Sequence, residues 1–303
     1  MAAIELDGVT KRFGDVEALR GVDMEVREGE IFGFLGPNGA GKTTTIDVLL
    51  DFVRATEGSA TVLGHDVHEE SRAIRERTGV LPEGFDVYGR LTGRQHVEFV
   101  SEAKGADADP DAVCERVGLD SEDFDRKAGG YSKGMKQRLV LGMALVGEPD
   151  LLILDEPSTG LDPNGARRMR EIVREERERG ATVFFSSHIL GQVESVCDRV
   201  AILQDGEVVA VDTVEGLREA AGTETVLTVN LAESVDGVVA AAEGVAGVES
   251  ARLSGATVIV RCSDDVKMDV LTAIEDAGGN VENFDTDEAS LDELFAAYTE
   301  DEE

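Results

Sequence analysis

Cysteine is scarce in this chain of 303 residues, and long apolar runs are absent from it. The three cysteines, Cys114, Cys197 and Cys262, lie far apart and form no CxxC pair, which argues against a disulfide framework and against a cysteine-based zinc site. The longest apolar stretch, residues 139–147, is well short of the roughly 18 residues that a membrane-spanning helix needs. Residues 1–5 show neither the basic nor the apolar region of a signal peptide. We therefore expect a cytoplasmic location.

Basic residues are also few, because 29 Lys and Arg face 63 Asp and Glu, for a net charge of −34. A surface this acidic repels the phosphate backbone, so no nucleic acid partner is expected. The carboxylates could form an acidic face for a partner, or they could reflect adaptation of the whole proteome to concentrated salt. They are scattered along the entire chain, and at molar salt the Debye length falls to about 3 Å, so self-repulsion is screened. This pattern favours the halophile interpretation.

A glycine-rich segment follows the apolar run 31–35 and precedes a helical pattern. Gly36, Gly41, Lys42 and Thr43 match the P-loop pattern G-x-x-x-x-G-K-[ST] in the strand–loop–helix context that its mechanism requires. Glycines let successive backbone N–H groups converge on phosphate oxygens, and the helix start adds its positive dipole end. Lys42 is expected to reach the β- and γ-phosphates, and the Thr43 hydroxyl to bind Mg²⁺. The segment predicts a nucleotide site.

Two further apolar runs end in polar side chains. Residues 151–154 precede Asp155 and Glu156, and residues 182–185 lead to His188. Ligands of open α/β sheets bind beyond the carboxyl ends of the strands, which predicts that Asp155 holds the magnesium shell through water. Glu156 is expected to act as general base and His188 to contact the γ-phosphate. The alternative is that these strands merely end in solvated acidic residues. A P-loop in the same chain makes this alternative the weaker interpretation.

The remaining histidines are expected to be structural. His65 and His68 are close enough in sequence to suggest a metal pair, but loop chemistry explains them better. His96 falls on a polar helical stretch and receives no role.

The segment YSKGMKQRL begins at Tyr131 and raises a different question. Ser132 is a predicted N-cap for a helix that continues to Leu145. The free N–H groups and the hydroxyl at such a helix start form an anion site. Because the P-loop already wraps phosphates in this chain, a second anion site is surplus unless it serves another nucleotide.

These motifs together resemble the ATP-binding cassette (ABC) ATPases, the motor subunits of ABC transporters. Residues 36–44 resemble Walker A, residues 151–156 Walker B, and residues 158–162 the D-loop. YSKGM resembles the Leu-Ser-Gly-Gly-Gln signature, although Tyr131, Lys133 and Met135 depart from it. The resemblance covers roughly residues 4–215. It implies ATP and Mg²⁺ as ligands, and a second nucleotide-binding subunit whose signature loop closes over the first subunit's ATP.

The resemblance also assigns further contacts. His188 corresponds to the switch histidine and Phe13 to the aromatic residue that stacks on adenine, and Val16 is expected among the nucleotide-binding residues. Glu83 stands where the family usually has the glutamine that touches magnesium and senses the membrane partner, so Glu83 is expected as a metal contact beside Thr43 and Asp155. The expected nucleotide-binding set is Phe13, Val16, Gly36, Pro37, Asn38, Gly39, Ala40, Gly41, Lys42, Thr43, Thr44, Ser132 and Gly134.

The predicted fold is α/β, with two domains. Residues 1–220 are expected to form a P-loop NTPase domain of ABC type, with a mixed sheet core and a helical subdomain over about 85–148. Residues 221–303 show the order β-α-β-β-α-β, which suggests a small ferredoxin-like α+β accessory domain. A final helix over 290–300 is expected, with Ser290 as its cap. The accessory domain carries no motif with assigned chemistry, so regulation, dimer support and a plain structural cap remain open.

Three functions compete. The leading one is the ATPase subunit of an ABC transporter of export type, peripheral at the inner face of the membrane, with its membrane-spanning permease subunits on separate chains. The second is a soluble non-transport ABC ATPase acting on DNA or ribosomes. The third is a regulatory nucleotide-binding module without turnover, suggested only by Glu83 and the altered signature.

Overall fold

The computed structural model describes residues 1–220, 225–235, 237–263 and 266–287. The chain divides into two compact units, Met1–Val214 and Glu215–Glu303. The division falls a few residues before the boundary that the sequence places at 220. The final helix expected over 290–300 lies outside the described residues. Every helix among the described residues is too short or too polar to cross a bilayer.

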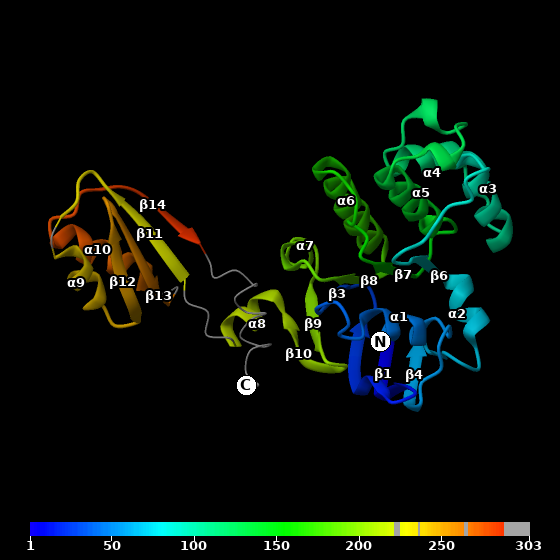
Figure 1. The fold of residues 1–303 in the computed structure, drawn as a ribbon, viewed down its shortest axis with the longest axis horizontal. Helices are drawn as coiled ribbons and strands as arrows, with labels where there is room; N and C mark the ends of the chain where they lie inside the picture. The colour runs from blue at the N-terminus through cyan, green and yellow to red at the C-terminus, as the bar shows by residue number, and fades with distance from the viewer. Residues whose placement is uncertain (221–224, 236, 264–265, 288–303) are drawn as a thin grey trace. The chain divides into compact units, whose positions relative to one another are not determined.

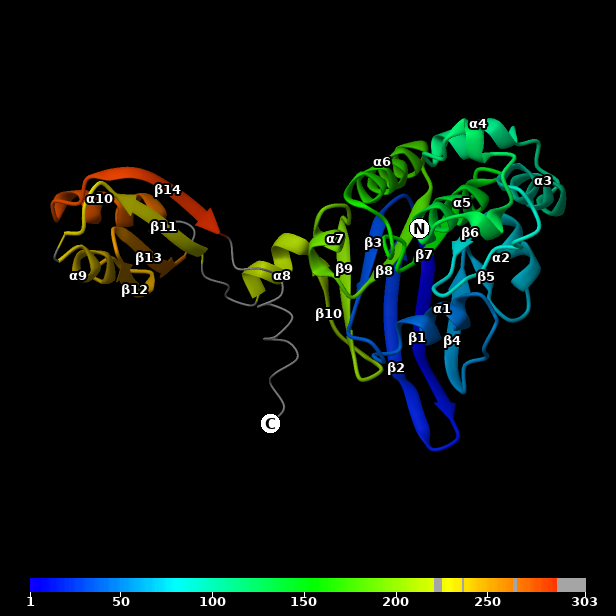
Figure 2. The same cartoon turned by 45° about the horizontal axis from the view of Figure 1, so that its top comes forward.

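The first unit contains two sheets (Figures 1 and 2). One is antiparallel with the order β2-β1-β4-β5, and its strands are β1 (Ala2–Phe13), β2 (Val16–Arg27), β4 (Glu57–Val62) and β5 (His65–Asp66). The other has the order β10-β9-β3-β8-β7-β6 and is parallel except for β10. Its strands are β3 (Ile31–Leu35), β6 (Thr78–Leu81), β7 (Leu151–Asp155), β8 (Thr182–Ser187), β9 (Arg199–Gln204) and β10 (Glu207–Thr213).

Helices cover both faces of the parallel sheet, as strands that are apolar on both sides require. Helix α1 (Lys42–Leu49) lies between the two sheets, whereas α5 (Lys133–Leu145) and α6 (Pro163–Arg179) lie on the opposite face (Figure 2). The unit also contains α2 (Ser71–Arg77), α3 (Gly93–Lys104), α4 (Pro110–Arg116) and α7 (Leu190–Glu194), with short 3₁₀ turns at Ser121–Asp123 and Ala128–Gly130.

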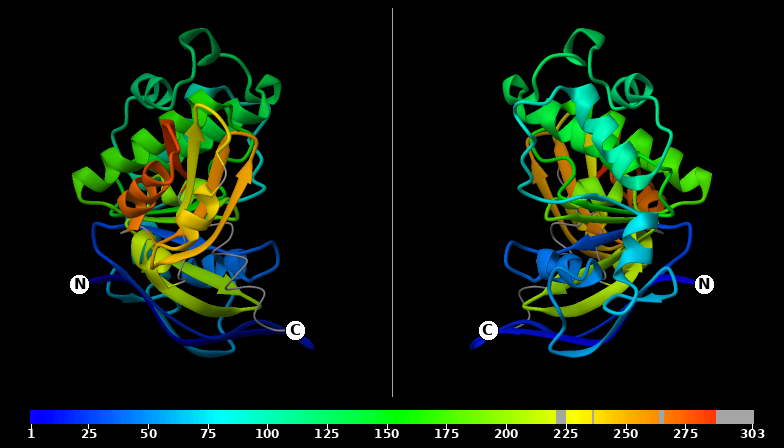
Figure 3. Two further views of the ribbon diagram at one scale, coloured as in Figure 1. Left: turned by 90° about the vertical axis from the view of Figure 1, so that its left-hand side faces the viewer. Right: turned by 90° about the vertical axis from the view of Figure 1, so that its right-hand side faces the viewer.

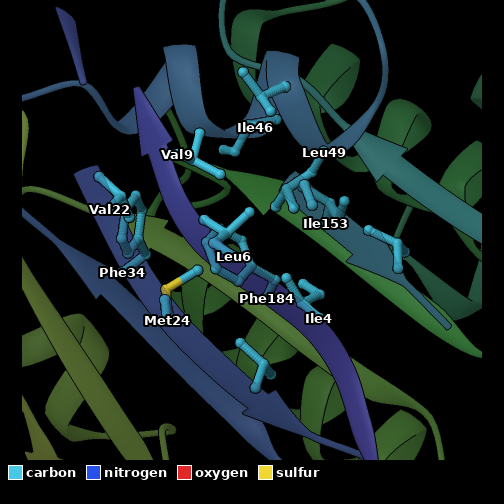
Figure 4. Close-up of a cluster of buried hydrophobic side chains, with 14 of the residues drawn as sticks. Ile4, Leu6, Val9, Val22, Met24, Phe34, Ile46, Leu49, Ile153 and Phe184 are labelled. Atoms are coloured by element: carbon cyan, nitrogen blue, oxygen red, sulfur yellow. The ribbon is translucent and has the colours of Figure 1, made fainter. Parts of the chain in front are cut away.

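The core between the sheets fixes the position of α1. Figure 4 shows Ile46 and Leu49 of α1 packed between side chains of the antiparallel sheet and Ile153 and Phe184 of the parallel sheet. All four side chains are at most 2% exposed. Since burying such a side chain contributes about 1.5–3 kcal/mol, this packing holds the helix start firmly at the carboxyl edge of β3.

The second unit is an independent α+β fold. It contains α8 (Val214–Ala220, which begins at the unit boundary), β11 (Thr225–Leu231), α9 (Val238–Glu243), β12 (Val248–Ser254), β13 (Thr257–Cys262), α10 (Lys267–Asp276) and β14 (Val281–Asp287). The antiparallel sheet order is β12-β13-β11-β14, and α9 and α10 pack on one face of it (Figures 1 and 3). This is the ferredoxin-like arrangement that the sequence predicted.

Candidate active site

The P-loop joins β3 to α1 and wraps tightly because two glycines allow it. A Cβ atom on Gly36 would lie 2.5 Å from the backbone oxygen of Leu203 on the neighbouring strand β9. Gly41 has φ +111°, and a Cβ there would lie 2.8 Å from the Ala18 backbone oxygen. Larger residues would push the loop away from the sheet or strain its backbone. The sequence pattern therefore reflects a real steric limit at both ends of the loop.

Lys42 is the first residue of α1 and is only 7% exposed. Its Nζ donates to the backbone oxygens of Gly36, at 2.6 Å, and Pro37, at 3.2 Å. The Glu156 carboxylate lies 3.8 Å from the same nitrogen. Burial lowers the pKa of the Lys42 ammonium, while the nearby carboxylates, first Glu156 and then Asp155, oppose that shift. A buried cation thus stands between the loop and the acids that end β7.

Asp155 ends β7 and faces the start of α1. The hydroxyl Oγ1 of Thr43 donates to Asp155 Oδ2 at 3.4 Å, and the Ser186 hydroxyl donates to Asp155 Oδ1. Asp155 is 2% exposed. A hydroxyl and a carboxylate side by side are hard oxygen donors, and Mg²⁺ is usually held by one or two such groups together with waters and substrate phosphates. These two residues therefore fit a magnesium ion shared with a nucleotide.

Glu156 adopts a left-handed backbone conformation, with φ +49°. Such a conformation costs a non-glycine residue of the order of 1 kcal/mol or more. Here the backbone N–H of Glu156 donates to the backbone oxygen of Ser186 at 3.3 Å and to its hydroxyl at 3.2 Å, which fixes the turn. The Glu156 side chain is 5% exposed, and its Oε1 lies 2.8 Å from His188 Nδ1. The ends of β7 and β8 thus place a buried carboxylate next to a histidine. Ser186, which contacts both Asp155 and Glu156, carries no motif in the sequence that points to this role.

Glu83 lies on the same side of the sheet. It shares a cavity of about 380 Å³ with Asp155 and Glu156, together with Tyr131 and Lys133 from the start of α5. Among the described residues, no group of three or more His, Cys, Asp and Glu side chains is placed to hold a metal ion. A direct metal contact from Glu83 therefore stays a prediction.

The start of α5 has the expected form. Ser132 is the N-cap, and its Oγ accepts the N–H of Met135 at 3.2 Å. The neighbouring Gly134 packs so closely on the D-loop that a Cβ there would lie 3.0 Å from the Gly160 backbone oxygen. Gln137, buried in the second turn, donates from Nε2 to the Pro157 backbone oxygen at 3.0 Å. The signature helix is therefore attached to the segment that follows Glu156.

The predicted residues thus fall into separate groups. Lys42, Thr43, Asp155, Glu156 and His188 form one contact cluster. Ser132 and Gly134 lie at the helix start beside the D-loop, and no hydrogen bond or ion pair of the described residues joins them to that cluster. Phe13 and Val16, at the turn between β1 and β2, are 49% and 66% exposed.

Comparison with known proteins agrees with this geometry. The family model "ABC transporter" matches residues 19–159, and the model "ATP-binding protein DrrA1-3-like, C-terminal domain" matches residues 213–299. The daunorubicin resistance ATP-binding protein DrrA3 of Streptomyces coeruleorubidus is 36% identical over 308 residues, covering 99% of this chain and 96% of that protein. The chain belongs to the ABC transporter ATP-binding proteins. Its fold class and its function as a transporter ATPase, both predicted from the sequence, are confirmed.

Other relatives of this ABC ATPase match a smaller share of the chain. A fluoroquinolones export ATP-binding protein of Mycobacterium tuberculosis is 40% identical over 218 residues, 71% of this chain and 72% of that protein. A solved ATP-binding subunit of an ABC transporter is 29% identical, with a TM-score of 0.66, over 73% of this chain and 93% of that one. A bacterial ABC transporter cassette solved as a dimer is 25% identical, with a TM-score of 0.64, over 70% of this chain and 98% of that one.

Proposed function

We propose that this ABC ATPase is the motor of an exporter, located at the cytoplasmic face of the membrane, where it binds Mg–ATP and drives a permease on separate chains. The observation that carries the proposal is the buried Glu156, joined to both Lys42 and His188. The relative that matches 99% of this chain is a daunorubicin resistance ATP-binding protein, and another relative is a fluoroquinolones export ATP-binding protein, which supports transport outward. An ATPase acting on DNA or ribosomes is disfavoured by the net charge of −34.

Nucleotide binding follows from the P-loop. The backbone N–H groups of residues 38–44, which include the start of α1, would surround the β- and γ-phosphates. Lys42 would exchange its two backbone acceptors for phosphate oxygens, which bind an ammonium more strongly. Thr43 and Asp155 would hold the magnesium ion, which neutralises phosphate charge when bound. The exposed ring of Phe13 and the side chain of Val16 would offer the adenine an apolar surface.

Hydrolysis then needs a base beside the γ-phosphate. In this proposal Glu156 accepts a proton from the attacking water as the oxygen–phosphorus bond forms and the bond to the β-phosphate oxygen breaks. His188 holds the carboxylate through Nδ1, and Lys42 offsets its charge. Lys42 and Glu156 are both buried, so their interaction is stronger than in water, whereas the His188 side chain is 43% exposed.

The signature loop supplies the other half of the site. Ser132 is exposed, and although its oxygen caps α5, its O–H remains free to donate. Together with the N–H groups near Gly134, it would bind the γ-phosphate held by a second subunit. We therefore propose a head-to-tail dimer with two shared sites.

The test is Glu156→Gln, which keeps the shape of the side chain but removes the base. We expect ATP binding to persist, turnover to fall by about 10²–10⁴, the range that general base catalysis contributes, and an ATP-bound dimer to accumulate. Steady-state hydrolysis and sedimentation with ATP measure both effects. Wild-type turnover in this variant would refute the assignment of the base.

The transport assignment needs a separate test. Purification from native membranes at high salt should bring down a polytopic membrane protein with the chain. Recovery with ribosomes or DNA instead would contradict export.

A further inference from the structure

His96 has no role in the sequence analysis, yet it is among the most enclosed polar side chains of the first unit. Its ring lies in α3 and is 1% exposed. Nδ1 lies 2.7 Å from the Thr92 backbone oxygen, and Nε2 lies 3.0 Å from the Tyr88 backbone nitrogen. Because Tyr88 N–H can only donate, Nε2 is the acceptor and Nδ1 carries the proton. Both ring nitrogens are therefore used by one neutral tautomer.

The Tyr88 N–H belongs to the loop that carries Glu83. This loop leaves β6 after Leu81 and reaches α3 at Gly93. Near its start, Glu83 shares the cavity of Asp155 and Glu156. Further along, His96 holds the loop against the helical subdomain. The loop thus runs from the catalytic edge of the sheet to a buried imidazole.

Other contacts also hold the loop near this point. The Gly129 N–H donates to the Gly89 backbone oxygen at 3.1 Å and the Ala128 N–H to the Leu91 backbone oxygen at 2.8 Å, beyond Tyr88 as seen from Glu83.

On the Glu83 side of Tyr88 the loop has a weaker contact. Asp86 pairs with Lys136 at 3.2 Å, but the Asp86 side chain is 82% exposed, so water and salt screen the pair. By contrast, the Tyr88 ring stacks over the His96 ring, with centroids 6.1 Å apart and planes at 25°. The edge of Phe99 then packs against Tyr88 at 6.4 Å. Tyr88 and Phe99 are themselves 66% and 54% exposed, whereas the His96 ring is enclosed, so the His96 contact is the better shielded of the two.

We propose that His96 is a positioning residue for hydrolysis: its Nε2 fixes the Glu83 loop at Tyr88 and so sets where Glu83 lies at the catalytic edge. The inference rests on the proposed function, because Glu83 matters only if ATP is hydrolysed beside Asp155 and Glu156. Gly84 lies between the two ends of the loop with φ +67° and gives the backbone freedom there. Without the His96 contact, Glu83 would sample positions away from the site.

Two variants of the full chain distinguish the effect of losing the Nε2 acceptor from the effect of losing the imidazole ring. His96→Asn places an amide near the position of Nδ1, so it keeps the bond to Thr92 but cannot reach Tyr88. His96→Gln is longer and places an amide oxygen near the position of Nε2, where it can accept the Tyr88 N–H. Both variants lose the ring and its stacking, and His96→Gln also gives up the bond to Thr92, so a recovery in His96→Gln relative to His96→Asn reports the acceptor.

The first measurement is hydrogen exchange at the Tyr88 amide, without nucleotide. We expect exchange in His96→Asn to be faster by about tenfold or more, since a lost hydrogen bond of ordinary strength has that effect, and His96→Gln to restore most of the protection. The second is steady-state hydrolysis of Mg–ATP. We expect kcat to fall by about ten- to a hundredfold in His96→Asn, as small misplacements of a catalytic part do, with KM little changed and kcat largely rescued in His96→Gln.

Glu83→Ala completes a double-mutant cycle. If His96 acts through Glu83, adding His96→Asn to Glu83→Ala lowers kcat no further. Additive losses, equal behaviour of the Asn and Gln variants, or unchanged kcat in Glu83→Ala alone would each overturn the proposal. The exchange measurement needs no turnover, so failure of the Glu156 assignment would remain distinguishable from failure of the His96 contact.

Discussion

Replacing Ser132 with alanine tests whether this chain supplies half of a partner's active site. Within its own chain, the Ser132 hydroxyl caps α5 through the Met135 N–H at 3.2 Å. Loss of such a cap costs about 1 kcal/mol. For a domain of this size, that corresponds to a decrease in melting temperature of about 2–4 °C. The fold should therefore survive the substitution.

The expected effect on the dimer is much larger. Each shared site would lose one hydrogen bond from the Ser132 hydroxyl to a charged phosphate, worth about 1.5–3 kcal/mol. Symmetry gives the dimer two such sites, so the loss is about 3–6 kcal/mol per dimer. The ATP-dependent dimerisation constant should then fall by about a hundred- to ten-thousandfold.

Sedimentation equilibrium with ATP, in the Glu156→Gln background that prevents turnover, measures this constant. Asp109→Ala is a matched control. The Asp109 carboxylate caps α4 by accepting the Asp111 N–H at 3.0 Å, so its loss has a similar cost in stability. Asp109→Ala should lower the melting temperature and leave dimerisation intact. If Ser132→Ala dimerises as well as the control, the shared phosphate site is wrong.

Two further predictions concern the first unit. Gly36→Ala brings a Cβ to 2.5 Å from the Leu203 backbone oxygen, and overpacking of about 1–3 kcal/mol should weaken ATP affinity by about tenfold or more in calorimetry. Gly244→Ala, which makes only ordinary contacts at 3.4 Å, should leave affinity unchanged, and equal affinities in all three proteins would contradict the steric limit. Burial raises the pKa of the Cys114 thiol from 9.0 to about 11. Above pH 9 the thiol ionises in the unfolded chain before it ionises in the folded one, so the free energy of unfolding falls between about pH 9 and 11. In urea titrations over this range, the free energy of unfolding of Cys114→Ala should fall less than that of the wild type. An identical fall in both proteins would refute this linkage.

The sequence predicts the phosphate site well because its requirements are local. Gly36 and Gly41 are needed by the steric limits of one short loop, and Lys42 and Thr43 follow directly at the helix start. Asp155 is also predictable, because residues 151–154 are buried on both faces and a parallel strand must end at the ligand edge. Each inference needs only one strand and the residues adjoining it.

What sequence reasoning missed depends on partners distant in the chain. Ser186 supports both Asp155 and Glu156 from another strand, and nothing near Ser186 in sequence announces that role. His96 lies on a largely polar helical stretch, and its contact with the Glu83 loop, through the Tyr88 N–H, is eight residues away in the chain. The structural role of a buried polar side chain depends on its hydrogen-bond partners, and the hydrophobic pattern of the sequence does not predict those partners.

The departures in the signature segment gain a physical meaning from the same contacts. Lysine is a poor choice at the first position of a helix, because the dipole there is positive. Yet the stem of Lys133 lies over Gly160 of the D-loop, where a Cβ would be 2.7 Å from the lysine chain, and Gly160 has φ +79°. Position 160 therefore requires glycine, both for its positive φ and for its close contact with Lys133. The Lys133 side chain gains this contact with the D-loop, although its charge is unfavourable at the helix start. Since Gly134 also lies close to the Gly160 backbone, the signature segment and the D-loop of one chain are in direct contact at two successive residues of α5.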